Sequence, residues 1–336
     1  MAAVTGGTVH QIAVVGCGNV SAMHFDGYNA HPERVRVVTA CDPVPERRAW
    51  AEQEHGVPRT FASVEDLLGF DSWDVAVVCT PSAVREPAVA ALAGAGKHVM
   101  TEKPLADTYA EARRLVELCA DAGVLLAVNQ NFRDHYAFGI AARLIADGEI
   151  GAVRGISQLD LMFRQDQGWR IRQQRHALSV MGVHWLDGFR QLIAADATRV
   201  LASTFSSPAI DCAGETDAFV QIDFGSVPVT YVQSFSSRVT VADTIVVGEQ
   251  GTLRFGYDKL IRVNDAGADR WDNPYAGPGK PESTFRSLNR LLDAIDAGQL
   301  PSNSGQDNLK TIALLEAAYA SADSKRPVEL SEGLPR

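Results

Sequence analysis

Five short runs rich in Val and Ile alternate with helical patterns over the first 130 residues, and this alternation constrains the fold more than any other feature of the chain. The runs cover residues 11–15, 35–40, 75–79, 98–100 and 124–128. Each is bounded by turn-forming residues, which is typical of parallel strands buried on both faces. The clearest helix between them is predicted over 108–122, because Thr108 and Glu111 have capping-box spacing and Gly123 follows. Repeated units of this kind predict a doubly wound parallel sheet covered by helices.

The pattern changes after about residue 132. Strands are predicted over 153–163, 200–206, 218–224, 229–235, 244–247 and 252–255. Short turns join several of them, which predicts a largely antiparallel sheet. Helices are predicted over 135–146, 177–193, 284–297 and 306–322, and a surface loop over 264–281, which is rich in Gly, Pro, Asn and Asp.

A chain of 336 residues also suggests about two domains. We therefore expect an α/β protein with domains over residues 1–132 and 133–336, in which the C-terminal helices could pack back on the first domain.

Charge and cysteine content exclude several classes of function. The chain has 31 Lys and Arg against 41 Asp and Glu, a net charge of −10, which argues against a nucleic-acid partner. No stretch approaches the ~20 apolar residues of a membrane span, and the N-terminus lacks the basic region of a signal peptide. An odd number of cysteines, with no CxxC pair and no Cys/His cluster, argues against a disulfide framework and against a structural zinc, and favours reduced thiols in a cytoplasm. These residues are Cys17, Cys41, Cys79, Cys119 and Cys212.

A glycine-rich turn, Gly16-Cys17-Gly18-Asn19-Val20-Ser21, directly follows the first predicted strand. Gly16 permits the tight turn, and Gly18 lets a pyrophosphate approach the backbone and the start of the next helix. Asp42 follows the second strand, 26 residues after Gly16, where a carboxylate binds a ribose 2′-hydroxyl and repels a 2′-phosphate. The turn therefore predicts NAD, with NADP less favoured. The alternatives are a glycine turn without a ligand, and Asp42 as a turn residue before Pro43.

Two further segments carry residues capable of acid–base chemistry. Glu102 and Lys103 follow the run at 98–100, at the edge where open α/β sheets bind ligands, although such a pair is often only solvated charge. His184 and Asp187 share one face of the helix predicted over 177–193, although a lone histidine there is as often a core residue.

Gly182 and Gly188 in the helix that carries His184 each cost about 1 kcal/mol relative to Ala. This cost predicts that something approaches the helix closely, either the nicotinamide or the neighbouring domain.

Several of these motifs together resemble the Gfo/Idh/MocA family (glucose–fructose oxidoreductase, inositol dehydrogenase, rhizopine catabolism) over essentially the whole chain. They are Glu102-Lys103-Pro104, Cys79-Thr80-Pro81, Gly182-x-His184-x-x-Asp187 and the strings at 246–253 and 317–321. The resemblance implies an N-terminal Rossmann domain, a second α/β domain with a large open sheet, a nicotinamide cofactor and a homo-oligomer, dimer or tetramer, built through that sheet. It also implies hydride transfer to or from a secondary alcohol of a polyhydroxylated substrate such as a sugar, cyclitol or glycoside.

The predicted site residues follow from the motifs and the resemblance together. We expect catalytic Lys103 and His184 near one point beside nicotinamide C4, with cofactor contacts from Gly16, Cys17, Gly18, Asn19, Val20, Asp42, Thr80, Pro81, Glu102, Lys103 and Asn131. We expect substrate contacts from Lys103, Arg133, Trp169, Arg170, His184 and Asp187, although Arg133 and Arg170 are equally well explained as rim charges.

The family commonly places an Asp four residues before this histidine, and this chain has Val180 there. Lys103 and His184 would then share the acid–base work without that carboxylate, or Asp187 would support His184. Either Lys103 acts as the base, its pKa lowered by burial and the nicotinamide ring, or a protonated Lys103 polarises the oxygen and His184 is the base. A non-catalytic dinucleotide sensor of the same fold is the alternative function, and the presence of Lys103 and His184 favours an enzyme.

Overall fold

The computed structural model describes residues 8–274, 279–331 and 334–335, and the chain divides into two compact units. Unit 1 comprises Met1–Asn131 and Lys280–Leu309, and unit 2 comprises Phe132–Gly279 and Lys310–Arg336.

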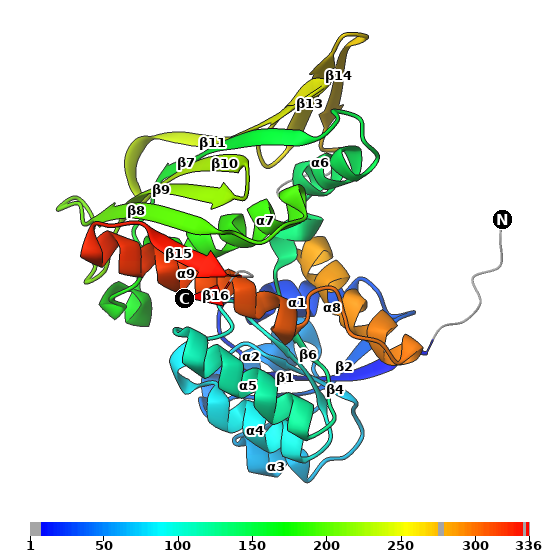
Figure 1. Ribbon diagram of the computed structural model, residues 1–336. Helices are drawn as coiled ribbons and strands as arrows, with labels where there is room; N and C mark the ends of the chain where they lie inside the picture. Colours follow the sequence, from blue (N-terminus) through cyan, green and yellow to red (C-terminus); the bar gives the residue numbers. More distant parts are fainter. Residues whose placement is uncertain (1–7, 275–278, 332–333, 336) are drawn as a thin grey trace. The chain divides into compact units, whose positions relative to one another are not determined.

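Unit 1 contains a six-stranded sheet in the order β3-β2-β1-β4-β5-β6, and every neighbouring pair is parallel (Figure 1). The strands are β1 (His10–Val15), β2 (Val35–Cys41), β3 (Thr60–Phe61), β4 (Val75–Val78), β5 (His98–Thr101) and β6 (Leu126–Val128). The doubly wound parallel sheet predicted from the apolar runs is confirmed. The strand order reverses between β1 and β4, so ligands are expected at the carboxyl ends of these strands.

Helices cover this sheet. They are α1 (Ser21–Asn29), α2 (Pro45–His55), α3 (Val64–Leu68), α4 (Glu86–Gly94), α5 (Tyr109–Asp121) and α8 (Lys280–Ala297), with a 3₁₀ turn at Ser82–Val84. α1 and α8 pack together, and their apolar side chains share a core with α2 and the sheet. α5 begins with the predicted capping box of Thr108 and Glu111, which is confirmed.

Unit 2 contains a ten-stranded sheet in the order β14-β13-β12-β11-β7-β10-β9-β8-β15-β16. The strands are β7 (Val153–Phe163), β8 (Arg199–Phe205), β9 (Asp217–Phe224), β10 (Val227–Ser234), β11 (Ser236–Gly248), β12 (Gly251–Phe255), β13 (Lys259–Asn264), β14 (Gly267–Asp272), β15 (Val328–Ser331) and β16 (Leu334–Pro335). β7 and β10 pair in parallel and the other paired strands are antiparallel, so the mostly antiparallel sheet is confirmed.

One face of the unit 2 sheet is covered by helices, and its core is built with apolar side chains from them. The helical segments of this part are 3₁₀ turns at Asn131–Asp134 and Gly168–Arg172, a π-helical turn at Leu178–Gly182, α6 (Tyr136–Ala146), α7 (Val183–Ile193) and α9 (Gly305–Ser324). The predicted helix over 177–193 therefore exists, but its first turn is π-helical. Among the described residues, no helix combines the length and apolar character needed to cross a membrane.

The loop predicted over 264–281 is wrong in its first part, where β14 pairs with β13 as a hairpin. Asn264 pairs with Gly267, so the turn residues that suggested a loop belong to a two-residue connection. Most side chains of β14 are exposed because it is an edge strand, and it therefore lacks the apolar alternation that predicts a strand. Residues 275–278 of the predicted loop lie outside the described residues.

Candidate active site

The glycine-rich turn lies where β1 ends, in a space that suits a phosphate group. Gly16 has a φ of +94°, and a Cβ there would lie 3.2 Å from the backbone of Thr80. A Cβ at Gly18 would have no heavy atom within 4 Å, so the space above the turn is open. α1 begins at Ser21 without a side-chain cap and without an acidic residue in its first turn. Its N-terminal N–H groups can therefore face an anion.

Asp42 follows β2 and binds the glycine-rich turn. One carboxylate oxygen accepts a hydrogen bond from the Cys17 N–H at 2.8 Å, and the other accepts from the Val44 N–H at 2.9 Å. Asp42 thus has the turn-forming role that the sequence left open as an alternative. Its proposed contact with a ribose stays a prediction.

Glu102 lies directly after β5, buried in a network of hydrogen bonds. Its carboxylate accepts from His24 Nε2 at 2.8 Å, from Asn129 Nδ2 at 2.6 Å and from the Lys103 N–H at 3.2 Å. Burial opposes ionisation, but the hydrogen bonds and charge of His24, together with Asn129 and the charge of Lys103, lower the pKa of Glu102 to about 2. Glu102 is therefore ionised at neutral pH.

Arg85 binds both the backbone that follows β4 and the backbone that follows β5. Its guanidinium donates to the carbonyl oxygens of Pro104 at 2.5 Å, Leu105 at 2.9 Å and Thr80 at 2.8 Å. Burial lowers the pKa of Arg85 to about 10, and the Glu102 charge opposes that shift, so Arg85 is a cation at neutral pH. The segments after β4 and β5, which contain Thr80, Pro81 and Lys103, are thereby tied together.

Buried polar atoms without a hydrogen-bond partner in the described structure gather at the carboxyl ends of β4, β5 and β6. They are Thr80 Oγ1, Thr101 Oγ1, Asn129 Oδ1 and both amide atoms of Gln130. Buried polar groups are normally satisfied, so this edge is built for a polar ligand. With the open glycine turn and the uncapped helix, these residues fit a dinucleotide. Asn131, also predicted to contact the cofactor, lies nearby in sequence and donates to Ser283 and Thr284 at 3.3 and 3.4 Å.

In unit 2, His184 is buried on α7 and its ring stacks on Phe132, with centroids 4.2 Å apart and an angle of 12° between planes. Phe132 in turn meets Trp185 and Tyr257 edge to face. Both of these donate to the buried Asp160, at 3.1 and 3.0 Å. The histidine is therefore oriented by a packed aromatic cluster.

The glycines of this helix are explained within unit 2. A Cβ at Gly188 would lie 2.9 Å from the Phe138 ring of α6, and one at Gly182 would lie 2.8 Å from Leu178. The predicted close approach to these glycines is confirmed, and side chains of the same unit make it.

Arg133 and Asp187, both predicted to contact substrate, bind each other. Two guanidinium nitrogens of Arg133 donate to the two oxygens of Asp187, each at 2.7 Å, and both side chains are buried. The Thr311 hydroxyl also donates to Asp187 at 2.9 Å. This pair fixes the segment next to Phe132 against α7.

Trp169 and Arg170 lie in the 3₁₀ turn after β7, where the guanidinium of Arg170 is 5.5 Å from the Trp169 ring centroid. Trp169 is 44% exposed. The loop is held by Asp166, which binds His176 at 3.0 Å and Arg164 at 2.9 Å.

Lys103 belongs to unit 1 and His184 to unit 2. Five residues of the site carry no functional signal in the sequence: His24, Arg85, Asn129, Gln130 and Phe132. A lone histidine or arginine in an otherwise apolar helical segment gives no functional signal before its partners are known, although His24 follows the glycine turn closely.

Comparison with known proteins agrees with this architecture. Residues 10–130 match the model of an oxidoreductase family with an NAD-binding Rossmann fold, and residues 138–254 match a GFO/IDH/MocA C-terminal domain. D-apiose dehydrogenase of Paraburkholderia graminis is 31% identical, with 95% of this chain and 89% of the relative covered. Inositol 2-dehydrogenase of Rhizobium meliloti is 23% identical, and the match covers 96% of this chain and 99% of the relative.

Among solved structures, an oxidoreductase from Agrobacterium radiobacter in complex with NAD⁺, L-tartaric acid and magnesium has the same fold. It superposes with a TM-score of 0.89 at 22% identity, and the match covers 96% of this chain and 98% of that one. From its two matched domains and its relatives, the chain belongs to the Gfo/Idh/MocA family of oxidoreductases.

Proposed function

We propose that this protein is an NAD-dependent dehydrogenase that oxidises a secondary hydroxyl of a sugar or cyclitol, or reduces the corresponding ketone. The observation that carries the proposal lies at the carboxyl ends of the unit 1 strands. The open glycine turn, the buried polar atoms without a partner in the described structure, and the Lys103 loop (the segment that follows β5) all lie there. The names of two relatives, D-apiose dehydrogenase and inositol 2-dehydrogenase, support polyhydroxylated substrates.

When bound, the nicotinamide supplies the hydride acceptor or donor. The chain must then bind the substrate oxygen and move its proton. The ionised Glu102 next to Lys103 favours the protonated form of that lysine, which can donate to the substrate oxygen. Histidine side chains commonly accept protons in catalysis, so we assign His184 as the base. Asn131, Trp169 and Arg170 are proposed to contact cofactor or substrate.

A screen of polyols, aldoses and glycosides tests this function. Purified protein with NAD is expected to produce NADH, followed by absorbance, with at least one member of a panel that includes apiose and inositols. The same panel with Lys103→Ala is the control for contaminating dehydrogenases. Tight NAD binding without turnover on any compound would favour the sensor.

We expect the enzyme to prefer NAD over NADP, because we assign the Asp42 carboxylate to the ribose 2′-hydroxyl, where it would repel a 2′-phosphate. Asp42→Asn keeps the size of the side chain but removes its charge, so discrimination against NADP should fall. The measurement is the ratio of kcat/KM for the two cofactors, with the exposed Asp74→Asn as a control that should leave the ratio unchanged. A wild-type enzyme that already uses NADP better would show that Asp42 does not select the cofactor.

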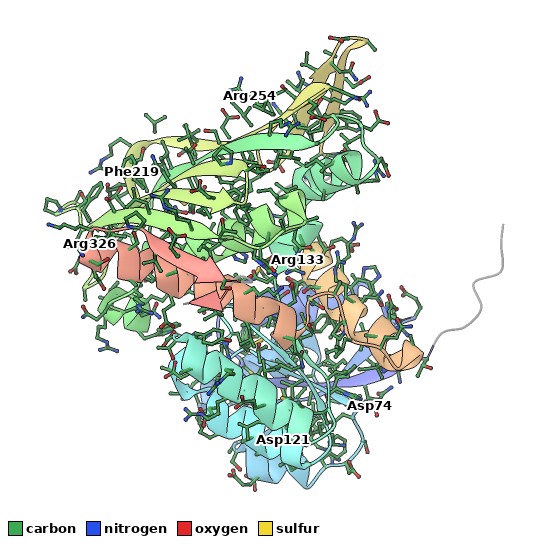
Figure 2. All side chains as sticks on the ribbon, viewed as in Figure 1. Asp74, Asp121, Arg133, Phe219, Arg254 and Arg326 are labelled. Atoms are coloured by element: carbon green, nitrogen blue, oxygen red, sulfur yellow. The ribbon has the colours of Figure 1, made fainter. Side chains whose placement is uncertain are left out.

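The face of the unit 2 sheet opposite its core carries several exposed apolar side chains, and we propose that it pairs with a second copy of the chain. Side chains there alternate with core residues along the strands, so they point away from the covering helices. They include Leu159, Phe163, Phe205, Phe219, Val247, Ile261 and Val263, each at least 36% exposed. Figure 2 labels Phe219, which stacks on Phe205. An exposed apolar face of this kind is a liability in a monomer, and symmetric pairing buries it.

Light scattering at micromolar concentration is therefore expected to show a dimer or tetramer. Phe219→Lys should lower the mass, because it places a charge in the apolar face. Leu300→Lys, at a residue 65% exposed in unit 1, is the matched control and should not. A wild-type protein that is monomeric throughout would contradict the proposal.

We also propose that the protein works in a reducing cytoplasm. All five cysteines are free thiols in the structure, and four of them are buried.

A further inference from the structure

His24 forms a buried ion pair with Glu102, and the proposed chemistry uses the Glu102 charge but gives no role to His24. His24 is fully buried, Glu102 is 6% exposed, and their side chains are 2.8 Å apart. Burial alone would lower the pKa of His24, but its contacts with Cys79, Tyr28 and Glu102 raise it well above the usual value. Burying two charges is costly, and replacing such a pair by apolar residues often stabilises a protein. A role in stability is therefore a weak explanation for the pair.

The pair connects two functional parts of unit 1. His24 lies on α1, the helix whose N-terminus follows the glycine turn, and its Nδ1 contacts the Tyr28 hydroxyl at 2.7 Å. Glu102 precedes Lys103 and binds the Lys103 N–H. Arg85 holds the other side of the same loop through the carbonyl oxygens of Pro104 and Leu105. The backbone on both sides of Lys103 is thus held by buried charged groups.

We propose that His24 is a positioning residue for Lys103: together with Glu102 and Arg85 it fixes the Lys103 loop, and its positive charge offsets the Glu102 carboxylate that the lysine ammonium group experiences. The catalytic meaning of this arrangement rests on the proposed function, since it assigns Lys103 to the substrate oxygen. The contacts themselves involve only unit 1.

The charges around Glu102 predict the direction in which each substitution changes the pKa of Lys103. The titratable groups that interact with the pair are Tyr28 of α1, Cys79 after β4, Arg85 before α4, and Lys103 itself. Asp107 interacts with Arg85. The Glu102 carboxylate contacts His24 at 2.8 Å and interacts with the charge of Lys103, so it links the two cationic side chains. Removing the carboxylate should therefore make Lys103 lose its proton at lower pH, and removing the His24 charge should make it lose its proton at higher pH.

Competitive labelling of amines tests this without substrate or cofactor. Cofactor-free protein is labelled with an isotopic acetylating reagent across a pH series, and the modification of Lys103, which is half-buried, is quantified by mass spectrometry. The exposed Lys259 in the same sample is the internal reference. Glu102→Gln is expected to shift the Lys103 midpoint down, and His24→Gln to shift it up, each by about one pH unit. Glutamine at position 24 can still donate to Glu102, so this variant removes mainly the charge.

His10→Gln is the matched control. His10 is also a buried histidine paired with a carboxylate, Asp296, but it lies at the amino end of β1, whereas Glu102 lies at the carboxyl end of β5. It should leave the Lys103 midpoint unchanged. If His24→Gln fails to fold, Tyr28→Phe removes the hydroxyl partner of His24 and should shift the midpoint in the same upward direction.

Two results would overturn the proposal: shifts of both variants in the same direction, as general loosening of the loop would produce, or no shift in either. A different experiment tests the proposed function, which is contradicted when no compound in the substrate panel is oxidised. Where a substrate is found, the basic limb of the pH–rate profile should move with the labelling midpoint in each variant.

Discussion

Replacing Lys103 by alanine is expected to lower turnover by about 100-fold or more, the usual scale for a lost acid–base group, while NAD binding stays nearly intact. Most of the proposed cofactor contacts come from the glycine turn, Asp42 and the carboxyl ends of β4, β5 and β6, so loss of the lysine side chain removes only a small part of them. Steady-state kinetics on the substrate found by the panel gives kcat, and fluorescence titration gives the affinity for NAD. Lys259→Ala, at an exposed lysine of unit 2, is the control.

His184→Ala is expected to cause a similar loss, and the double variant should lose far less than the product of the two effects. Residues that move one proton as a unit are strongly non-additive, because removing either one already disables the step. If the loss in the double variant instead equals the product of the two single losses, the two residues act in different steps. Full turnover by Lys103→Ala would contradict the catalytic assignment altogether and leave NAD binding with a sensing role.

The sequence predicts the architecture well where one physical signal dominates. Apolar runs such as 75–79 are strands buried on both faces, and the capping box at Thr108 marks a helix start through local hydrogen bonds alone. The edge strand β14 is not predicted from the sequence, because its exposed side chains show no alternation of apolar and polar residues. The parallel pairing of β7 with β10 is also not predicted, because which strands are neighbours in a sheet depends on the whole topology.

The candidate site is predictable only where a motif is continuous in sequence. Gly16, Asp42 and Glu102 stand out because each follows a strand. What Glu102 does with its charge depends on His24, 78 residues earlier, and this contact forms only when the strands align. The sequence also predicts Arg133 and Asp187 as substrate contacts, because no local pattern shows that these residues, 54 positions apart, bind each other. Long-range pairing of buried charges is the information that a local pattern lacks.

The Arg133–Asp187 pair yields the largest expected effect on stability. Asp187 accepts from Arg133 and Thr311, and Arg190 lies 3.8 Å from the same carboxylate. Replacing Asp187 by asparagine leaves Arg133 buried without its counter-charge, and breaking a buried pair in this way costs about 3–5 kcal/mol. Arg133→Met should cost less, because the carboxylate keeps Thr311 and Arg190. The double variant should cost less than the sum of the two single changes.

Denaturant unfolding of the four proteins measures this cycle, and Arg254→Met provides the matched control. Arg254 also binds an aspartate, Asp243, with two hydrogen bonds in the same unit, but its side chain is 65% exposed (labelled with Arg133 in Figure 2). Solvent already satisfies an exposed pair, so this control should unfold almost as the wild type does. The substrate role implied by the family resemblance predicts the opposite pattern, in which Asp187→Asn raises KM for the substrate and leaves the unfolding midpoint in place. That result would show that the buried ion pair is dispensable for the fold and that Asp187 is held ready for the substrate.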